Sequence, residues 1–246
     1  WFQLKQLILS KFRSTKCGYC EFSVKTNIMI KIPVYFMPGL AASAQIFERI
    51  VLPDTIFETV LLEWEIPLDN ETLLQYAKRM TQKITHPNPV LIGVSFGGIL
   101  VQEMAQFIQV RKVIIISSVK TSLEFPLRMK VAKTTKAYKL IPTTLFANIE
   151  SLSKFSFGEK INQRLKLYEK FLRVRDKRYL DWAVEQVILW ERTVADESVI
   201  HIHGDEDDVF PIKNIQNCIV VKGGTHVMIL TKYKWLNENL PKIILE

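Results

Sequence analysis

A serine framed by glycines is the first feature of this sequence that could do chemistry. Residues 93–97 read Gly-Val-Ser-Phe-Gly, with an apolar strand candidate before Ser95 and a helical pattern that starts at Phe96. A serine on a sharp strand-to-helix turn has strained backbone geometry, and small residues two positions away on either side avoid clashes. Such a turn directs its side chain toward the carboxyl end of a parallel sheet. The pattern therefore favours Ser95 as a nucleophile over a plain glycine-rich turn.

A serine hydroxyl is a poor nucleophile at neutral pH and needs a base within hydrogen-bond reach. The chain has four histidines. His86 lies in a proline-bounded loop, and His201 and His203 share one face of a strand candidate, where packing is a simpler prediction than half of a metal site. His226 follows a Gly-Gly-Thr loop, residues 223–225, after the last strand candidate. This loop delivers His226 to the same sheet edge as the serine, so we expect His226 to be the base.

A carboxylate should orient this histidine and stabilise its protonated form. Four acids follow the strand candidate Val199–His203: Asp205, Glu206, Asp207 and Asp208. Their crowding leaves the choice among them open, and a solvated acidic turn is the alternative interpretation. The chain order of serine, acid and histidine is complete, which favours a catalytic role for this loop.

The surrounding elements alternate between strands and helices, as in a parallel sheet covered by helices. We therefore predict the α/β class with a mostly parallel sheet. Asp69 or Asn70 is expected to cap the first helix. The predicted strands are Val34–Met37, Glu58–Leu62, Val90–Val94, Val113–Ser117, Val199–His203 and Asn217–Val221, and the predicted helices are Glu71–Ile84, Phe96–Ile108 and His226–Leu240.

Residues 121–197 interrupt this alternation. They contain no convincing strand, but apolar residues recur at helical spacing, as in Ile161-Leu165-Tyr168-Leu172 and Ala183-Val187-Trp190. We therefore predict a helical lid inserted between two core segments, 29–120 and 198–246. Residues 1–28 are expected to be an extension outside the core, because Met29 opens the first strand candidate and reads as a natural start. An edge strand over Glu21–Val24 is the alternative.

The composition, with 48% hydrophobic and 24% charged residues, is that of an ordinary globular protein. No apolar run approaches the roughly 18–20 residues of a membrane-spanning helix, so no integral membrane segment is expected. Three cysteines exclude a disulfide scaffold and suit a reducing compartment, so we expect a cytoplasmic protein. Residues 120–200 carry sixteen Lys/Arg against ten Asp/Glu. Because no nucleic-acid-binding motif accompanies this charge, no nucleic-acid partner is predicted, and a solvated basic surface is the simpler interpretation.

Three stretches together resemble the α/β-hydrolase superfamily, in its lid-bearing branch, over residues 30–246: residues 93–98, 203–211 and 223–226. In that family the catalytic acid stands three residues after a glycine and four before a proline. Only Asp207 satisfies both spacings, from Gly204 and Pro211. Asp208 is the second choice and Asp205 the third. The family also places its helical lid where the predicted insertion falls.

The resemblance further implies an oxyanion hole made of two backbone N–H groups. One belongs to Phe96, directly after the nucleophile. The other belongs, in the family, to the residue after a His-Gly pair at the end of an early strand. Here Met37-Pro38-Gly39-Leu40 stands at that position, so Leu40 inherits the role while Pro38 replaces the usual histidine.

The resemblance therefore implies a serine hydrolase that cleaves a carboxylic ester or thioester through an acyl-enzyme, with a Ser95-His226-Asp207 triad and no metal or organic cofactor. Lyases and carbon–carbon hydrolases of the family use the same triad, so the fold does not determine the reaction. A ligand receptor with slow or no turnover is the alternative from another class. The basic insertion suits a small acyl substrate with an anionic handle. The oligomeric state is left open.

Overall fold

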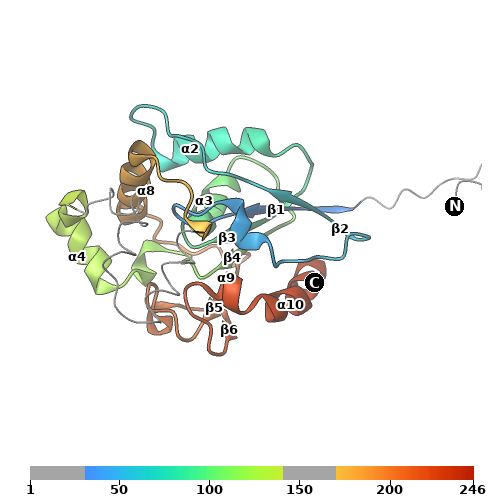
Figure 1. Ribbon diagram of the computed structural model, residues 1–246. Coiled ribbons are helices and arrows are strands. Elements are labelled where there is room, and N and C mark those ends of the chain that lie inside the picture. The colour runs from blue at the N-terminus through green and yellow to red at the C-terminus, as the bar shows by residue number, and fades with distance from the viewer. Residues whose placement is uncertain (1–30, 141–169) are drawn as a thin grey trace, which may run out of the picture. The chain divides into compact units, whose positions relative to one another are not determined.

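The computed structural model describes residues 31–140 and 170–246, so the extension predicted over 1–28 lies outside the described residues. Its centre is a six-stranded sheet in the order β2-β1-β3-β4-β5-β6, in which every neighbouring pair is parallel (Figure 1). The predicted α/β class is confirmed, and every strand overlaps its predicted range. The strands are β1 (Ile32–Met37), β2 (Phe57–Leu61), β3 (Val90–Val94), β4 (Lys112–Ile116), β5 (Ile200–Gly204) and β6 (Ile219–Val221).

The central strands are apolar throughout because helices cover both faces of the sheet. Successive residues point to opposite faces, so Leu91 packs in one cluster while Val90 and Ile92 pack in the other. Figure 1 shows the helices of the two faces on opposite sides of the strands. The first face carries α2 (Leu73–Met80) and α3 (Phe96–Met104), and the second carries α9 (Met228–Thr231) and α10 (Tyr233–Leu245).

The start of α2 differs from the prediction. Asp69 and Asn70 are not its caps. The Thr72 side chain accepts the Gln75 N–H at 3.3 Å, and the Gln75 side chain accepts the Thr72 N–H at 2.9 Å. This reciprocal capping box satisfies two backbone donors at once, which a single aspartate or asparagine cap does not.

The closing helix also differs from the prediction. The expected helix His226–Leu240 is divided into α9 and α10 at Lys232, whose φ of −112° and ψ of 22° are not helical. The helix after the serine is shorter than expected, since α3 ends at Met104 and not at Ile108.

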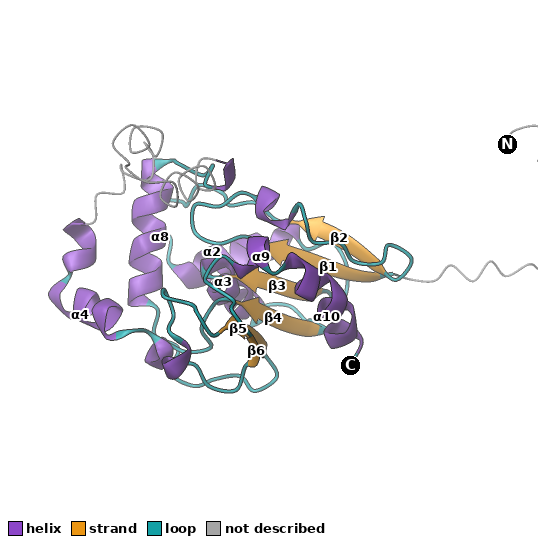
Figure 2. Ribbon diagram, turned by 60° about the horizontal axis from the view of Figure 1, so that its bottom comes forward, coloured by secondary structure: helices purple, strands orange, loops and turns teal. Residues whose placement is uncertain are grey.

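The described parts of the predicted insertion, residues 121–140 and 170–197, contain two α-helices of eight residues or more and no strand. These helices are α4 (Leu127–Thr135) and α8 (Lys177–Leu189), whereas the spacing pattern at Ile161–Tyr168 lies outside the described residues. Both helices lie beyond the carboxyl ends of the strands (Figure 2). Among the described residues, no helix combines the length and apolarity needed to cross a membrane.

Two glycines allow β3 to pass into α3 in very little space. A Cβ added at Gly93 would lie 2.2 Å from the Gly97 carbonyl oxygen, and one added at Gly97 would lie 2.4 Å from the Pro38 carbonyl oxygen and 2.5 Å from that of Met37. The first turn of α3 is therefore pressed against both β3 and the end of β1. No side chain larger than hydrogen fits there without backbone movement.

We expect Gly97→Ala to lower the free energy of unfolding by about 1–3 kcal/mol, the range for overpacked sites, because the atoms in its way belong to the backbone. Gly39→Ala is the matched control. Its Cβ would meet Ser95 Cβ at 3.4 Å and the Val94 carbonyl oxygen at 3.5 Å, which are ordinary van der Waals contacts. Its stability should therefore fall by less than that of Gly97→Ala. Urea denaturation followed by circular dichroism measures both changes. Equal stabilities of the two variants would contradict the close approach at Gly97.

Candidate active site

Ser95 occupies the turn between β3 and α3 in a strained conformation, with φ 51° and ψ −120°. Residues other than glycine rarely adopt a positive φ. The turn is held from both sides. The Ser95 carbonyl oxygen accepts the Gly98 N–H at 2.9 Å and the Ser118 hydroxyl at 2.7 Å, and the Ser95 N–H donates to the Ile116 carbonyl at 3.0 Å. The helix start and β4 together keep the serine in this conformation.

One histidine bridges Ser95 and an acid. His226 Nε2 lies 3.0 Å from Ser95 Oγ, and His226 Nδ1 lies 2.9 Å from Asp207 Oδ2 and 3.2 Å from Oδ1. The three residues follow β3, β6 and β5, so they meet at the carboxyl edge of the sheet. Since an ionised carboxylate only accepts hydrogen bonds, it holds the proton on Nδ1 and leaves Nε2 free to take a proton from the serine.

The carboxylate of Asp207 is fully buried, but protein groups donate hydrogen bonds to it. Its Oδ1 accepts the N–H groups of Val209 at 2.8 Å and Phe210 at 2.9 Å. Burial alone would raise the pKa of Asp207, but the hydrogen bond and charge of His226 and the Phe210 N–H outweigh it and hold the pKa below its ordinary value. The acid is therefore ionised at neutral pH.

The loops that carry Asp207 and His226 meet through two glycines. A Cβ at Gly204 would lie 2.1 Å from the Gly224 carbonyl oxygen. The carboxylate of Asp205 accepts the Gly223 N–H, which ties the two loops together further. Neither Asp205 nor Asp208 bonds to His226 among the residues that the structure describes, so the geometry pairs the histidine with Asp207, which the family spacing ranks first.

The loop after β1 brings Gly39, the residue before Leu40, next to the nucleophile. Residues 39–42 form a tight turn in which the Ala42 N–H donates to the Gly39 carbonyl at 3.1 Å and Ala41 has a φ of 62°. Gly39 lies against Ser95, as the 3.4 Å separation of its added Cβ from Ser95 Cβ shows. Within residues 31–140 and 170–246, neither the Leu40 N–H nor the Phe96 N–H donates a hydrogen bond.

Two further histidines stand behind the acid, and their contact with its loop was missed at the sequence level. His201 Nε2 lies 3.0 Å from His203 Nδ1, and His203 Nε2 lies 2.8 Å from the Phe210 carbonyl oxygen and 3.7 Å from Asp207 Oδ2. Burial lowers the pKa of both, to about 3 for His201. A carbonyl oxygen only accepts hydrogen bonds, so the neutral His203 donates its Nε2–H to Phe210. Its Nδ1 then accepts the hydrogen bond from His201 Nε2–H.

The two histidines support the loop that carries Asp207. Among the described residues, no group of three His, Cys, Asp or Glu side chains is placed to hold a metal ion. The sequence signal for the contact is weak, since it consists only of the four-residue spacing between His203 and Asp207.

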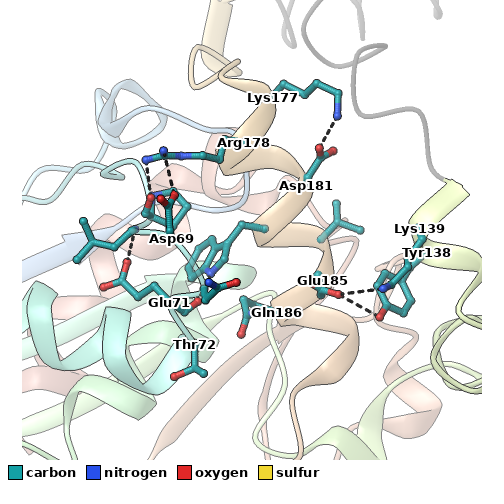
Figure 3. Close-up of a pocket in the computed structure, with 15 residues that line it drawn as sticks. Asp69, Glu71, Thr72, Tyr138, Lys139, Lys177, Arg178, Asp181, Glu185 and Gln186 are labelled. Carbon is teal, nitrogen blue, oxygen red and sulfur yellow. Dashed lines mark hydrogen bonds and ion pairs between the residues drawn. The ribbon is translucent and has the colours of Figure 1, made fainter.

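A cavity of about 690 Å³ lies beside α8, and no residue of the Ser95-His226-Asp207 group lines it. Figure 3 shows it between α8 and the loop of residues 67–72, with polar side chains that point toward one another. Six of its seven charged side chains form ion pairs within the cavity wall: Arg178 with Asp69, Lys177 with Asp181, and Lys139 with Glu185. The seventh, Glu71, pairs with Arg79 outside the wall. The cavity is therefore separate from the candidate active site.

The lowered pKa of Asp207 predicts a pH dependence of stability. Its contribution is fully present above the unfolded-state pKa, about 3.9 for an aspartate, and is lost as the pH falls through the lower native pKa. The difference in unfolding free energy between wild type and Asp207→Asn should therefore be constant near pH 5 and shrink below about pH 4. Urea unfolding between pH 3 and pH 5 measures it. An equal dependence for Asp208→Asn, in the same loop but without contact to His226, would contradict this assignment.

No protein-family model matches this chain, and no curated protein matches it by sequence. Solved structures do match it over nearly the whole length of both chains. An esterase from Exiguobacterium antarcticum superposes with a TM-score of 0.60 at 15% identity, covering 89% of this chain and 94% of the esterase. A bromoperoxidase from Bacillus anthracis has a TM-score of 0.59 at 17% identity, with 88% and 92% covered.

A third similar structure is the enol-lactonase from Burkholderia xenovorans LB400, with a TM-score of 0.62 at 11% identity and the same coverage of 88% and 92%. These identities are too low to transfer an activity, so the likeness is one of fold. The structural neighbours are α/β-hydrolases. The chain has the α/β-hydrolase fold.

Proposed function

We propose that this protein is a serine hydrolase that cleaves small carboxylic esters or thioesters through an acyl-enzyme intermediate. The observation that carries the proposal is the position of His226, which bonds Ser95 Oγ through one ring nitrogen and Asp207 through the other. This arrangement is the one that acyl transfer by serine requires, with nucleophile, base and orienting acid in a single hydrogen-bonded chain.

In the proposed reaction, Ser95 Oγ attacks the acyl carbon while His226 Nε2 takes the hydroxyl proton. The N–H groups of Leu40 and Phe96 stabilise the negative oxygen of the tetrahedral intermediate. The protonated His226 then gives its proton to the departing alcohol or thiol, and Asp207 stabilises the imidazolium until it does. Water, activated by the same histidine, releases the acid and restores the serine.

The structural neighbours support acyl chemistry. Besides the esterase and the enol-lactonase, one similar structure is described as an N-acyl homoserine lactone degrading enzyme, with a TM-score of 0.62 at 16% identity. Esters and lactones are cleaved by the same attack on an acyl carbon. The bromoperoxidase among the neighbours is a reminder that one fold hosts several reactions, so the assay has to measure hydrolysis directly.

The ion pairs of the insertion weaken the case for an anionic substrate, which its excess of basic residues suggested. At least six of the eleven basic residues described in the insertion are paired with acids: Lys133 with Glu191, Lys139 with Glu185, Lys170 with Glu48, Lys177 with Asp181, Arg178 with Asp69, and Arg192 with Glu103. Paired charges attract a distant anion less than free ones do. We therefore place an uncharged small ester first. An acyl-CoA whose kcat/KM falls more steeply with salt than that of a neutral ester would favour the anionic class.

We expect the wild-type protein to hydrolyse p-nitrophenyl esters with a burst of p-nitrophenol, and Ser95→Ala to lower kcat by about 10⁴-fold to 10⁶-fold. The reason is that alanine removes the nucleophile while the rest of the site stays intact. A panel of acyl chains from acetate to decanoate gives the chain-length preference. Ser198→Ala is the control, because within the described residues the Ser198 hydroxyl bonds to Asp196 of its own turn, and its variant should retain wild-type rates.

Equal rates for wild type and Ser95→Ala would contradict the nucleophile assignment. An absence of turnover across the panel, together with a ligand-induced thermal shift that Ser95→Ala retains, would instead favour a receptor. Mass spectrometry after treatment with a fluorophosphonate provides an independent measurement, since the adduct should form on Ser95 and be absent from the alanine variant.

A further inference from the structure

The indole of Trp64 contacts both parts of the proposed oxyanion hole. Trp64 follows β2 and is only 7% exposed. Its Nε1–H donates to the Gly39 carbonyl oxygen at 2.8 Å. Its ring stacks on the ring of Phe96, with centroids 4.9 Å apart and 10° between the planes. The Trp64 side chain therefore contacts the peptide group between Gly39 and Leu40 and also Phe96, which carries the second N–H donor.

The hydrogen bond to Gly39 determines where the Leu40 N–H points. The Gly39 carbonyl and the Leu40 N–H belong to one peptide group, which is planar and trans, so its C=O and N–H point in opposite directions. Fixing the carbonyl therefore fixes the N–H. Two donors hold that carbonyl oxygen, Trp64 Nε1–H from outside the turn and the Ala42 N–H, at 3.1 Å, from within it. Rotation of the peptide would leave a buried indole N–H without a partner, which is unfavourable.

The next peptide of the loop is also held, whereas the Leu40 N–H donates no hydrogen bond within the residues that the structure describes. The Ala41 N–H donates to the Tyr179 hydroxyl at 3.4 Å. The Tyr179 ring lies 5.4 Å from the Trp64 ring, so the two side chains form one buried support beneath the turn. Gly39 itself lies against Ser95. The restrained peptide therefore lies beside the nucleophile.

The ring stack relates this first donor to the second. Phe96 is 1% exposed and is the first residue of α3, so its backbone moves only with the helix start. Stacking on Phe96 fixes the distance between the indole and the start of α3. The hydrogen bond from the indole Nε1–H to Gly39 then fixes the Leu40 peptide relative to the same helix start. Tryptophan suits this task because it combines a large flat ring with a donor at its edge. Phenylalanine would keep the stack and lose the donor.

We propose that Trp64 is a positioning residue for the oxyanion hole. Its role rests on the proposed function, and it consists of orienting the Leu40 N–H toward the negative oxygen at a set separation from the Phe96 N–H. Stabilisation of this kind acts on the transition state and not on the bound ester. Loss of the indole N–H should therefore lower kcat and leave KM nearly unchanged, which a general loss of packing does not predict.

The test uses Trp64→Phe in the full chain, with kcat and KM for the best p-nitrophenyl ester and the inhibition constant of a trifluoromethyl ketone with the same acyl chain. We expect kcat to fall by about 10-fold to 100-fold, less than the roughly 100-fold to 1000-fold loss when a donor is removed entirely. The ketone forms a tetrahedral adduct with Ser95, so its inhibition constant should rise by the same factor as kcat/KM falls.

Trp182→Phe is the matched control. Trp182 belongs to the same aromatic cluster, and its Nε1–H also donates to a backbone carbonyl, that of Glu71, at 2.6 Å. It does not bond to the turn at residues 39–42. The control variant should lose stability as Trp64→Phe does while kcat/KM stays within about twofold of wild type. Equal losses of kcat/KM in the two variants, or a wild-type kcat in Trp64→Phe, would overturn the proposal.

A measurement on the unmodified chain provides a test if Trp64→Phe does not fold. When the Leu40 N–H binds an oxyanion, its peptide becomes more polarised and its carbonyl a stronger acceptor. The ¹⁵N–¹H signal of the Trp64 indole should therefore move downfield on formation of the ketone adduct, while that of Trp182 stays in place. An unmoved Trp64 signal in a protein that forms the adduct would overturn the proposal.

Failure of the proposed function would look different. A wild-type protein without ester hydrolysis, but with ketone binding that Ser95→Ala abolishes, would refute the hydrolase assignment. Trp64→Phe could then still be tested through the dissociation constant of the ketone, measured by direct binding. A wild-type protein with neither property would overturn both proposals.

Discussion

The backbone of Ser95 holds a positive φ at the point where β3 passes into α3, and the surrounding structure has to compensate for that strain. It does so by compression. Gly93 and Gly97 let the chain fold back on itself with separations that no Cβ would permit, and the Pro38 carbonyl closes the same space from β1. Because three elements meet at these contacts, the helix start cannot relax without displacing the sheet. These close contacts hold the serine in place.

A second close approach, between Gly204 and Gly224, brings together the loops after β5 and β6. It places His226 within reach of Ser95 on one side and of a buried carboxylate on the other. An isolated carboxylate would be very unfavourable there. Asp207 is tolerated because two backbone N–H groups and the histidine satisfy it. The same contacts keep it ionised, so stability and the proposed chemistry depend on the same bonds.

The aromatic cluster between α3 and α8 connects the insertion to this centre. Phe96, directly after the serine, stacks on Trp64, and Tyr179 of α8 lies against the same indole. All three side chains are buried. Large rings of this kind contribute strongly to packing energy and have few rotamers. The described part of the insertion is therefore continuous with the core around the nucleophile. Most of the charged groups that line the cavity near Arg178 are paired with one another.

Local sequence patterns determined the strands, the parallel class and the turn at Ser95, because strand burial and strand-to-helix turns depend on residues next to each other in the chain. They did not determine the cap of α2, where the reciprocal bonds of Thr72 compete with a nearby aspartate, or the break at Lys232. The four neighbouring acids, residues 205–208, could be ranked only by the spacing typical of the family. The tertiary structure then pairs Asp207 with His226. The indole of Trp64 gave no signal at all. It reaches Gly39 across 25 residues, and such contacts arise only when separate elements pack, since the periodicity of each element reports its own backbone and not its neighbours.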